Sequence, residues 1–263
     1  MLFRSIIFSA IPAALVSGLI LSLFQIILLN PIILAAEQFE VTDSQVDHHA
    51  HSHSHSTNQT ATVVETHNDI VNDNHNSQEP EWEPANLTQR QLFSLLTNVI
   101  TAFGFSVMMI ALMAQIQSKR SSNLTIVKRL IWGAAGFATF FAIPAMGMSP
   151  EIPGMQAADL SSRQLWWSFT VICSGAGLFI VFFAPLKFKL VSVLLLLAPF
   201  IVGVPGFEGL EFLQEDVETL TILNNLHHKF IYLTVIANAV FWLVIGLTGG
   251  FAVQRESFKK LLS

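Results

Sequence analysis

The stretch SIIFSAIPAALVSGLILSLFQIILLNPIILAA, residues 5–36, contains no Asp, Glu, Lys, Arg or His. About 20 helical residues are enough to cross the roughly 30 Å hydrocarbon core of a bilayer. The run is continuous, whereas a strand of a membrane barrel alternates apolar and polar residues and needs only about 10 residues. Residues 5–36 are therefore predicted to form a membrane-spanning helix.

Five further stretches lack the same five residue types, and every Asp, Glu, Lys, Arg and His of the chain lies outside these six stretches. Only 12% of the residues are charged, against about 25% in a soluble protein. A helix satisfies its own backbone hydrogen bonds in lipid. The sequence thus predicts an all-α integral membrane protein with a bundle of six transmembrane helices. The further stretches are 91–118, 130–150, 164–186, 190–207 and 230–254.

These stretches divide the chain into a first transmembrane helix (1–36), a histidine-rich loop (37–90), a five-helix bundle with short loops (91–254) and a tail (255–263). The first helix has an alternative interpretation as a cleaved signal peptide, with LAA before Glu37 as the cleavage site. Its apolar run is far longer than the about 7–15 residues of a signal core, which favours retention. Cleavage would leave five spans, and the histidine-rich loop would still face outward.

The loop charges predict the orientation, because short cytoplasmic loops are rich in Lys and Arg. With the N-terminus in the cytoplasm, ten of the 13 basic residues lie on the cytoplasmic side, but only one of the 18 acidic residues, Glu256. Both termini are therefore expected to be cytoplasmic, and the three outer loops form an anionic face. The ten basic residues are Arg4, Lys119, Arg120, Lys128, Arg129, Lys187, Lys189, Arg255, Lys259 and Lys260.

The first outer loop contains the stretch VDHHAHSHSHSTNQ, which begins at Val46. Its polar composition cannot offset the entropy of ordering, so the loop is expected to be disordered. Neutral imidazole is a common ligand of Co²⁺, Ni²⁺ and Zn²⁺, and the alternating spacing lets two or three side chains surround one ion. A polar spacer or an expression tag is the plainer alternative. The candidate metal ligands are His48, His49, His51, His53, His55, His67 and His75.

The other outer loops carry further candidate groups. Asp159 and Arg163 are spaced i, i+4, so they can pair on one helical face. The third outer loop is anionic and ends at His227 and His228; it could attract cations or be a plain solvated loop. Three methionines offer thioether ligands for soft ions, although packing is the more common role of methionine. They are Met146, Met148 and Met155.

The spans offer only neutral polar groups, whereas proton pumps and many ion-coupled transporters need ionisable ones. Such neutral groups could line a permeation path, or they could tie helices together. The chain has no glycine-rich phosphate-binding loop and no pairing of a nucleophile with a base. We therefore expect no enzyme activity, no nucleic-acid partner and no permanently bound cofactor. The neutral groups are Gln25, Asn30, Asn98, Thr101, Cys173, Ser174 and Asn238.

Three segments carry a family resemblance: LLNPIILAAEQFE (28–40), RLIWGAAGFATFFAIPAMGMSPEIPGMQAADLSSRQLWWSFTVICSGAGL (129–178) and LLLLAPFIVGVP (194–205). They resemble the CbtA-type cobalt transporter subunit family. The resemblance implies a bacterial inner-membrane protein that handles cobalt, often with a small single-span partner that has its own histidine motif.

The resemblance also directs attention to particular positions. It implies that Asp159 and Arg163 form a functional or gating pair rather than a plain surface pair. The other matched positions are Glu37, Glu151, Pro153, Gly154, Gln164 and Trp166. The candidates for gating or permeation are Glu37, Glu151, Asp159, Arg163 and Gln164.

We therefore expect a subunit of a divalent-metal transporter that takes up Co²⁺, with Ni²⁺ or Zn²⁺ as further candidates, and whose outer loop collects the ion. Two alternatives stay open: a membrane-anchored sensor or chaperone that binds metal without moving it, and an exporter. Metal flux that depends on the spans would separate a transporter from a sensor. Metal tolerance in place of accumulation would indicate export.

The histidine spacing leads to a prediction for residues 37–90. The isolated segment should bind Co²⁺, Ni²⁺ or Zn²⁺ at about pH 7.5 and release the ion near about pH 5, because protonated imidazole is not a ligand. Titration calorimetry at the two pH values measures both events. The absence of a binding heat, or a heat that does not change with pH, would contradict this role.

Overall fold

The computed structural model describes residues 2–46, 84, 86–120, 123–206, 212, 214 and 216–254. Within these residues the fold is helical, apart from turns and one isolated antiparallel bridge between Met155 and Phe212. The elements in chain order are α1 (Leu2–Phe24), the π-helical turn η1 (Gln25–Leu29), α2 (Asn30–Val46), α3 (Leu87–Arg120), α4 (Ile126–Phe137), the π-helical turn η2 (Ala138–Ala142), α5 (Ile143–Gly147), α6 (Leu160–Phe183), the 3-10 turn η3 (Leu186–Phe188), α7 (Lys189–Val202) and α8 (Val217–Gln254).

Five helical segments among the described residues are long and apolar enough to cross a membrane, which confirms the predicted all-α membrane bundle. The stretch 190–207 forms the shorter α7, whose 14 residues rise by about 21 Å and so do not cover a core of roughly 30 Å. α7 ends at Gly203, which has a φ of 101°, a conformation that glycine adopts readily. The five segments are Phe3–Phe39, Leu87–Lys119, Ile126–Gly147, Leu160–Phe183 and Val217–Gln254.

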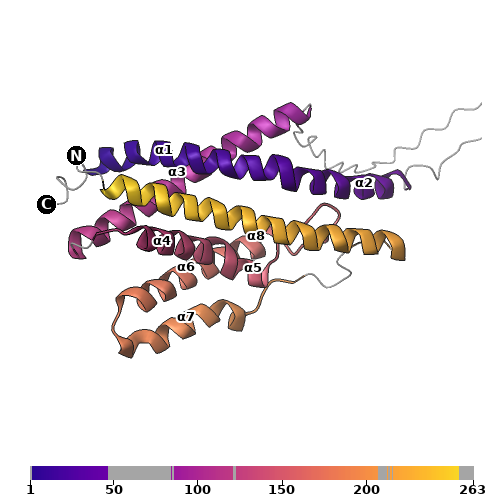
Figure 1. Cartoon of the computed structure of the whole chain (residues 1–263). Helices are drawn as coiled ribbons and strands as arrows, with labels where there is room; N and C mark the ends of the chain where they lie inside the picture. The colour runs from indigo at the N-terminus through magenta and orange to yellow at the C-terminus, as the bar shows by residue number, and fades with distance from the viewer. Residues whose placement is uncertain are drawn as a thin grey trace, which may run out of the picture.

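The helices pass back and forth, so their charged ends gather at two ends of the bundle (Figure 1). α1 begins, α3 ends, α4 begins, α6 ends and α8 ends at the same end, on the left in Figure 1. We call it the basic end, because it carries Lys119, Lys128 and Lys187. The opposite end, the acidic end, carries Glu37 and Asp159. This alternation is the one that the six apolar stretches predict.

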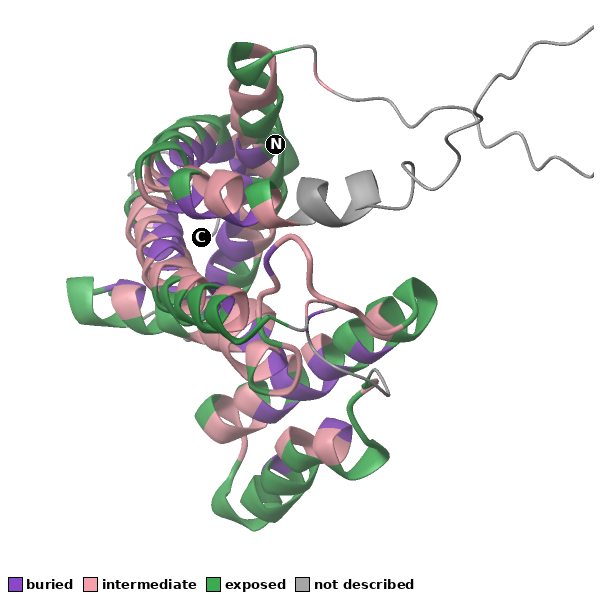
Figure 2. Cartoon of the chain, turned by 90° about the vertical axis from the view of Figure 1, so that its right-hand side faces the viewer, coloured by how far each residue is buried: buried purple, intermediate pink, exposed green. Residues whose placement is uncertain are grey.

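The core lies between the long helices. α1 packs against α3 and α8, α4 packs against α8, and α6 pairs with α7. Viewed along the bundle, buried residues face the space between neighbouring helices and exposed residues cover the outside (Figure 2). Trp242 of α8 stacks on Phe140 of η2 with ring centroids 5.1 Å apart, and Phe105 of α3 lies 4.7 Å from the same indole. This aromatic group ties three helical segments together.

α4 and α8 approach each other closely because glycines line their contact. A Cβ atom at Gly246 would lie 2.5 Å from the Arg129 carbonyl oxygen and 2.6 Å from the Gly133 nitrogen. A Cβ atom at Gly250 would lie 2.3 Å from Arg129 Cγ. Small residues let helix backbones come close in lipid. The glycines of α8 therefore form a notch for the backbone and side chain of α4.

Arg129 occupies this notch and is only 5% exposed. Its Nε donates to the Leu124 carbonyl at 3.0 Å, a terminal nitrogen contacts the Gln254 side-chain oxygen, and the guanidinium carbon lies 3.9 Å from the centroid of the Phe251 ring. Hydrogen bonds and a cation–π contact offset part of the hydration that burial removes, while the other terminal nitrogen is buried without a hydrogen-bond partner. The sequence pattern did not reveal this role, because the apolar stretch begins only at residue 130.

Two helices extend far beyond the apolar stretches, which corrects the expected loop boundaries. α8 begins at Val217 rather than near residue 230, and α2 continues to Val46, so part of the expected loop 37–90 is helical. A second apolar cluster at the acidic end gives the reason, because it packs both extensions against the loops. The Gln214 amide also donates to the Phe39 carbonyl at 2.9 Å. The buried members of the cluster are Ala36, Ile152, Phe212 and Leu223.

The glycine notch makes a testable prediction. Gly246→Ala should lower the free energy of unfolding by about 1–3 kcal/mol, the usual cost of overpacking against atoms that cannot move aside. Gly104→Ala is the matched control, because a Cβ there would have no neighbouring atom within 4 Å. Unfolding of the purified variants by heat or SDS measures the difference. Wild-type stability of Gly246→Ala would contradict the close contact of α4 and α8.

Candidate functional site

A polar contact inside the apolar part of the bundle joins α3 to α1 and η1. Asn98 Nδ2 donates to Ser22 Oγ at 3.0 Å and to Gln25 Oε1 at 2.6 Å. Asn98 and Ser22 are both buried. An amide in lipid must find its partners within the protein, so this contact fixes α3 against α1. Of the neutral groups named from the sequence, the structure thus brings Gln25 and Asn98 together.

The π-helical turn η1 begins at Gln25 and has an identifiable cause. Pro31 lacks an N–H, so it cannot donate to the carbonyl of Ile27 four residues earlier. The N–H of Asn30 donates to the Gln25 carbonyl instead, five residues back. Single π turns within α-helices occur frequently at functional sites. Because Asn98 donates to Gln25, the first residue of η1, the irregular turn lies directly beside the Asn98 contact.

A pocket of about 340 Å³ opens at this contact, and we call it the polar pocket. Amide, hydroxyl and guanidinium groups from η1 and α3 contribute to its wall. Arg90 and Asn98, eight residues apart on α3, are separated by about 12 Å along the helix axis. The polar pocket thus extends from the acidic end into the apolar part of the bundle. Its lining residues are Gln25, Pro84, Arg90, Phe93, Ser94, Thr97 and Asn98.

A bidentate ion pair lies at the acidic end of the polar pocket. The Arg90 guanidinium donates to Glu37 Oε1 at 2.5 Å and to Glu37 Oε2 at 3.2 Å. The side chains are 40% and 31% exposed, so water screens the pair only in part. Paired hydrogen bonds give an arginine–carboxylate contact geometric specificity as well as strength. Glu37, a candidate gating residue, therefore joins α2 to α3 at this position.

A second ion pair links the loop before α6 to that helix, and it corrects the expected pairing of Asp159 with Arg163. Arg163 contacts Glu151, with 2.9 Å between its terminal nitrogen and Glu151 Oε2. Asp159 instead caps α6, accepting from the Ser162 N–H at 3.1 Å. An N-cap carboxylate turns toward the unpaired N–H groups of the first turn, and it is then directed away from the side chain one turn later. Gln164, also a candidate, is exposed.

His227 ties this loop to α8, a role that the sequence did not suggest. The side chain is 7% exposed, and its Nε2 lies 3.1 Å from the Pro150 carbonyl oxygen. Phe212 meets the imidazole edge-on, and His228 stacks beside it. A signal was present: Leu223 and Phe230 flank His227 at helical spacing, which would have placed it on the packed face of a helix.

The start of α8 keeps a carboxylate ionised at the acidic end. The backbone N–H and the hydroxyl of Thr219 donate to Asp216 Oδ2 at 2.9 Å and 2.7 Å. These hydrogen bonds stabilise the charged form and lower the pKa of Asp216 below its ordinary value. The carboxylate therefore stays negative at neutral pH, and it stays so at a more acidic pH than an ordinary aspartate would.

The described part of the chain contains no group of three or more His, Cys, Asp or Glu residues that could hold a metal ion. Met155 serves packing, because it lies against the apolar cluster of the acidic end. Cys173 is buried, while Ser174 donates to the Thr139 carbonyl and Asn238 to the Thr234 carbonyl. The predicted ligands lie outside the described residues: His48, His49, His51, His53, His55, His67 and His75.

The long apolar helices, with a polar pocket held between two of them, define a multi-pass integral membrane protein. Within that class the chain belongs to the CbtA family, because the model of this family, described as a probable cobalt transporter subunit, matches residues 3–254. Searches of curated proteins and of solved structures found no match.

Charge exchange tests the ion pair of Glu37 and Arg90. Glu37→Arg or Arg90→Glu alone places like charges together and should cost about 1 kcal/mol of stability, the upper part of the range for partly exposed pairs. The double variant restores opposite charges and should recover most of that loss. Reversible unfolding of the four proteins in detergent measures the coupling. A double variant no more stable than the weaker single variant would contradict the contact.

Proposed function

We propose that this chain is a subunit of an uptake system for Co²⁺, with Ni²⁺ or Zn²⁺ as secondary substrates, in a bacterial inner membrane. Membership of the CbtA family supports cobalt as the cargo. The observation that carries the mechanism is the polar pocket, since it is the place where neutral groups of two membrane-spanning segments meet beside an ion pair. The proposal assigns it the first step of permeation.

The chemistry of the pocket suits passage rather than storage. The oxygens of Gln25, Ser94 and Thr97 can replace part of the hydration shell of a cation without holding it firmly. Conduction requires binding that is favourable enough for entry and weak enough for release. A cation that reaches the pocket also competes with Arg90 for the Glu37 carboxylate. The ion pair is therefore proposed as a gate.

The histidine-rich loop would supply ions directly to this pocket. α2 ends at Val46 and α3 begins at Leu87, so the loop joins the two helices whose ion pair borders the pocket, and Pro84 lines it. His48 follows Val46 by two positions. With the basic end in the cytoplasm, as loop charges favour, both termini are cytoplasmic and the loop collects metal outside. An anionic outer end attracts cations, which favours uptake.

The charged contacts near α6 are proposed to couple the gate to the rest of the bundle. Glu151 pairs with Arg163, and the carbonyl oxygen of the neighbouring Pro150 lies 3.1 Å from His227 Nε2 of α8. A change at this loop would thus reach α6 and α8 together. The partner implied by the resemblance, a small single-span protein with its own histidine motif, would complete the transporter.

A sensor or chaperone is the second candidate function. No described residue deep in the spans, away from their ends, is an Asp or Glu that could bind a divalent ion strongly or relay a proton. If the chain is a sensor or chaperone, the histidine-rich loop would bind metal and pass it to a partner. An exporter is the third candidate, and it would use the same polar pocket in the opposite direction.

Uptake of radioactive cobalt separates these functions. Cells that express the chain together with the single-span partner should accumulate cobalt, and Asn98→Leu should lower the initial rate about tenfold, which corresponds to ~1.4 kcal/mol. Thr101→Val is the matched control, because Thr101 is exposed on the same helix. Deletion of residues 48–55 should lower uptake only when cobalt is scarce, since the tract collects ions.

Each other outcome points to another function. Metal binding without any expression-dependent flux would support the sensor or chaperone. Lower accumulation together with greater metal tolerance would support export. Equal rates for Asn98→Leu and wild type, at matched amounts of protein in the membrane, would remove the polar pocket from the permeation path.

A further inference from the structure

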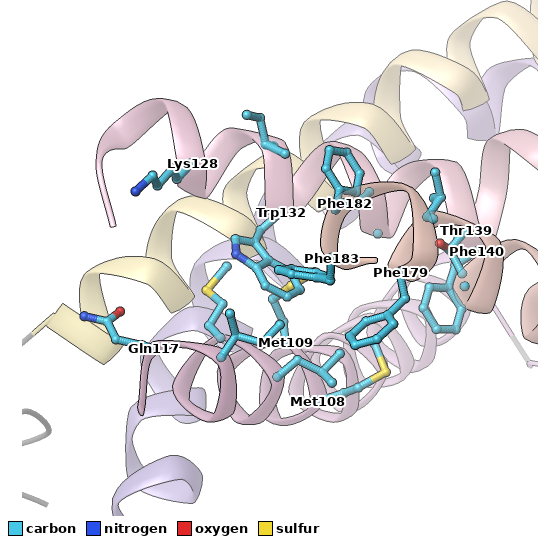
Figure 3. A pocket seen from close by; sticks show the side chains of 18 of the residues that line it. Met108, Met109, Gln117, Lys128, Trp132, Thr139, Phe140, Phe179, Phe182 and Phe183 are labelled. Carbon is cyan, nitrogen blue, oxygen red and sulfur yellow. The ribbon is translucent and has the colours of Figure 1, made fainter. Parts of the chain in front are cut away.

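A second pocket, unrelated to the polar pocket, lies between α3, α4 and α6 toward the basic end. Its volume of about 590 Å³ falls within the range of about 300–1,000 Å³ typical of ligand sites. Apolar side chains form nearly all of the wall, among them Met109, Trp132 and Phe179 (Figure 3). Exposed apolar residues, such as Ile131 and Ile172, also belong to the lining. The pocket therefore lies where lipid would surround the bundle.

The pocket has one polar end. Lys128 of α4 and Gln117 of α3 lie at the same end of the cavity, on opposite walls, whereas Thr139 and Phe140 lie at the other end (Figure 3). The Lys128 ammonium donates to the Asn123 carbonyl at 3.1 Å, which leaves two of its three donor hydrogens for a ligand. Gln117 Oε1 is buried and has no hydrogen-bond partner. A ligand that fits must offer an anion to Lys128 and a donor to Gln117.

The charge around this end favours an anion. Lys119, Lys128 and Lys187 lie at the basic end, while the described acidic residues all lie at the opposite end. The acidic residues whose side chains the structure describes are Glu37, Glu151, Asp159, Asp216 and Glu218. The attraction of Lys128 for an anion therefore meets no competition from a nearby described carboxylate. Basic groups beside a membrane surface attract anionic lipids.

The length of the pocket indicates whether a lipid or a transmembrane helix of a partner fits it. Lys128 and Thr139 are eleven residues apart, which corresponds to about 16 Å along the helix axis. That distance is about half of the roughly 30 Å hydrocarbon core, the depth of one leaflet. A transmembrane helix of a partner would need a groove along the whole core, whereas an acyl chain needs one leaflet only.

We propose that this pocket binds one anionic glycerophospholipid of the phosphatidylglycerol class from the leaflet at the basic end. An acyl chain fills the apolar cavity between Trp132 and Phe140. The phosphodiester contacts the Lys128 ammonium, and a glycerol hydroxyl of the head group donates to Gln117 Oε1. The bound lipid bridges α3, α4 and α6, and so it fills a space that the protein leaves open beside its core.

Native mass spectrometry of the full-length protein in detergent tests the head-group contact, with phosphatidylglycerol and phosphatidylcholine of equal chain length as probes. The wild type should retain one phosphatidylglycerol and bind phosphatidylcholine more weakly. Lys128→Ala should weaken phosphatidylglycerol binding about fivefold, the effect expected for one basic residue at a membrane surface. Lys187→Ala is the control, because Lys187 does not line the pocket. Equal affinity of the wild type for the two lipids would overturn the proposal.

Filling the cavity tests the acyl-chain site. Ala135→Phe should abolish retention of the lipid, whereas Ala134→Phe, an exposed neighbour outside the lining, should leave it unchanged. Gly175→Leu gives a second filling variant, because a Cβ there would have only Thr139 Cγ2 within 4 Å, at 3.5 Å. Retained lipid in both filling variants would overturn the proposal. So would a polypeptide that copurifies with the wild type and is lost from both filling variants, since it would identify a helix as the occupant.

Discussion

A polar group in the hydrocarbon core of a membrane has no water to bond with, and this constraint shapes each part of the structure. It confines the backbone of the described spans to helices, and it makes each interruption of a helix require a substitute bond. Where Pro31 removes a donor, η1 supplies a bond from Asn30 to Gln25. Where α7 ends, the indole N–H of Trp166 donates to the Pro199 carbonyl at 3.1 Å.

The same constraint explains why polar side chains meet in pairs. Asn98 finds Ser22 and Gln25 on the neighbouring segment, and these contacts give the polar pocket its shape. Arg129 is a more demanding case, since a guanidinium has more donors than a neutral amide. The glycine notch of α8 meets part of this demand by giving the side chain a groove, an aromatic face and a polar partner at the end of the helix. One terminal nitrogen of the guanidinium is buried without a partner.

The sequence was sufficient for the helical class and the alternation of the spans, because apolar runs of membrane length have few other structures open to them. It failed where a distant partner decides the outcome. α8 begins at Val217, where Asp216 accepts from Thr219 and the first turns of the helix pack against α2 and Phe212; only the cap and the helical spacing around His227 are local signals. Arg163 could reach Asp159 by spacing alone, yet the cap of α6 engages Asp159 and leaves Arg163 to Glu151. Gln25 and Asn98 were recognisable as polar groups, but their meeting depends on how α1 crosses α3.

The short helix α7 has a consequence for the membrane around the protein. Its principal helical neighbour is α6, so its outer face meets lipid directly, and its length of about 21 Å is less than the thickness of an average bilayer core. The bilayer beside α7 must thin, or the helix end must draw the interface inward. The free-energy cost of this deformation grows with each ångström of mismatch. Cells that shorten their fatty acids relieve this deformation, and cells that lengthen them increase it. α7 thereby makes one side of the bundle responsive to bilayer thickness, and it favours residence in thinner regions of the membrane.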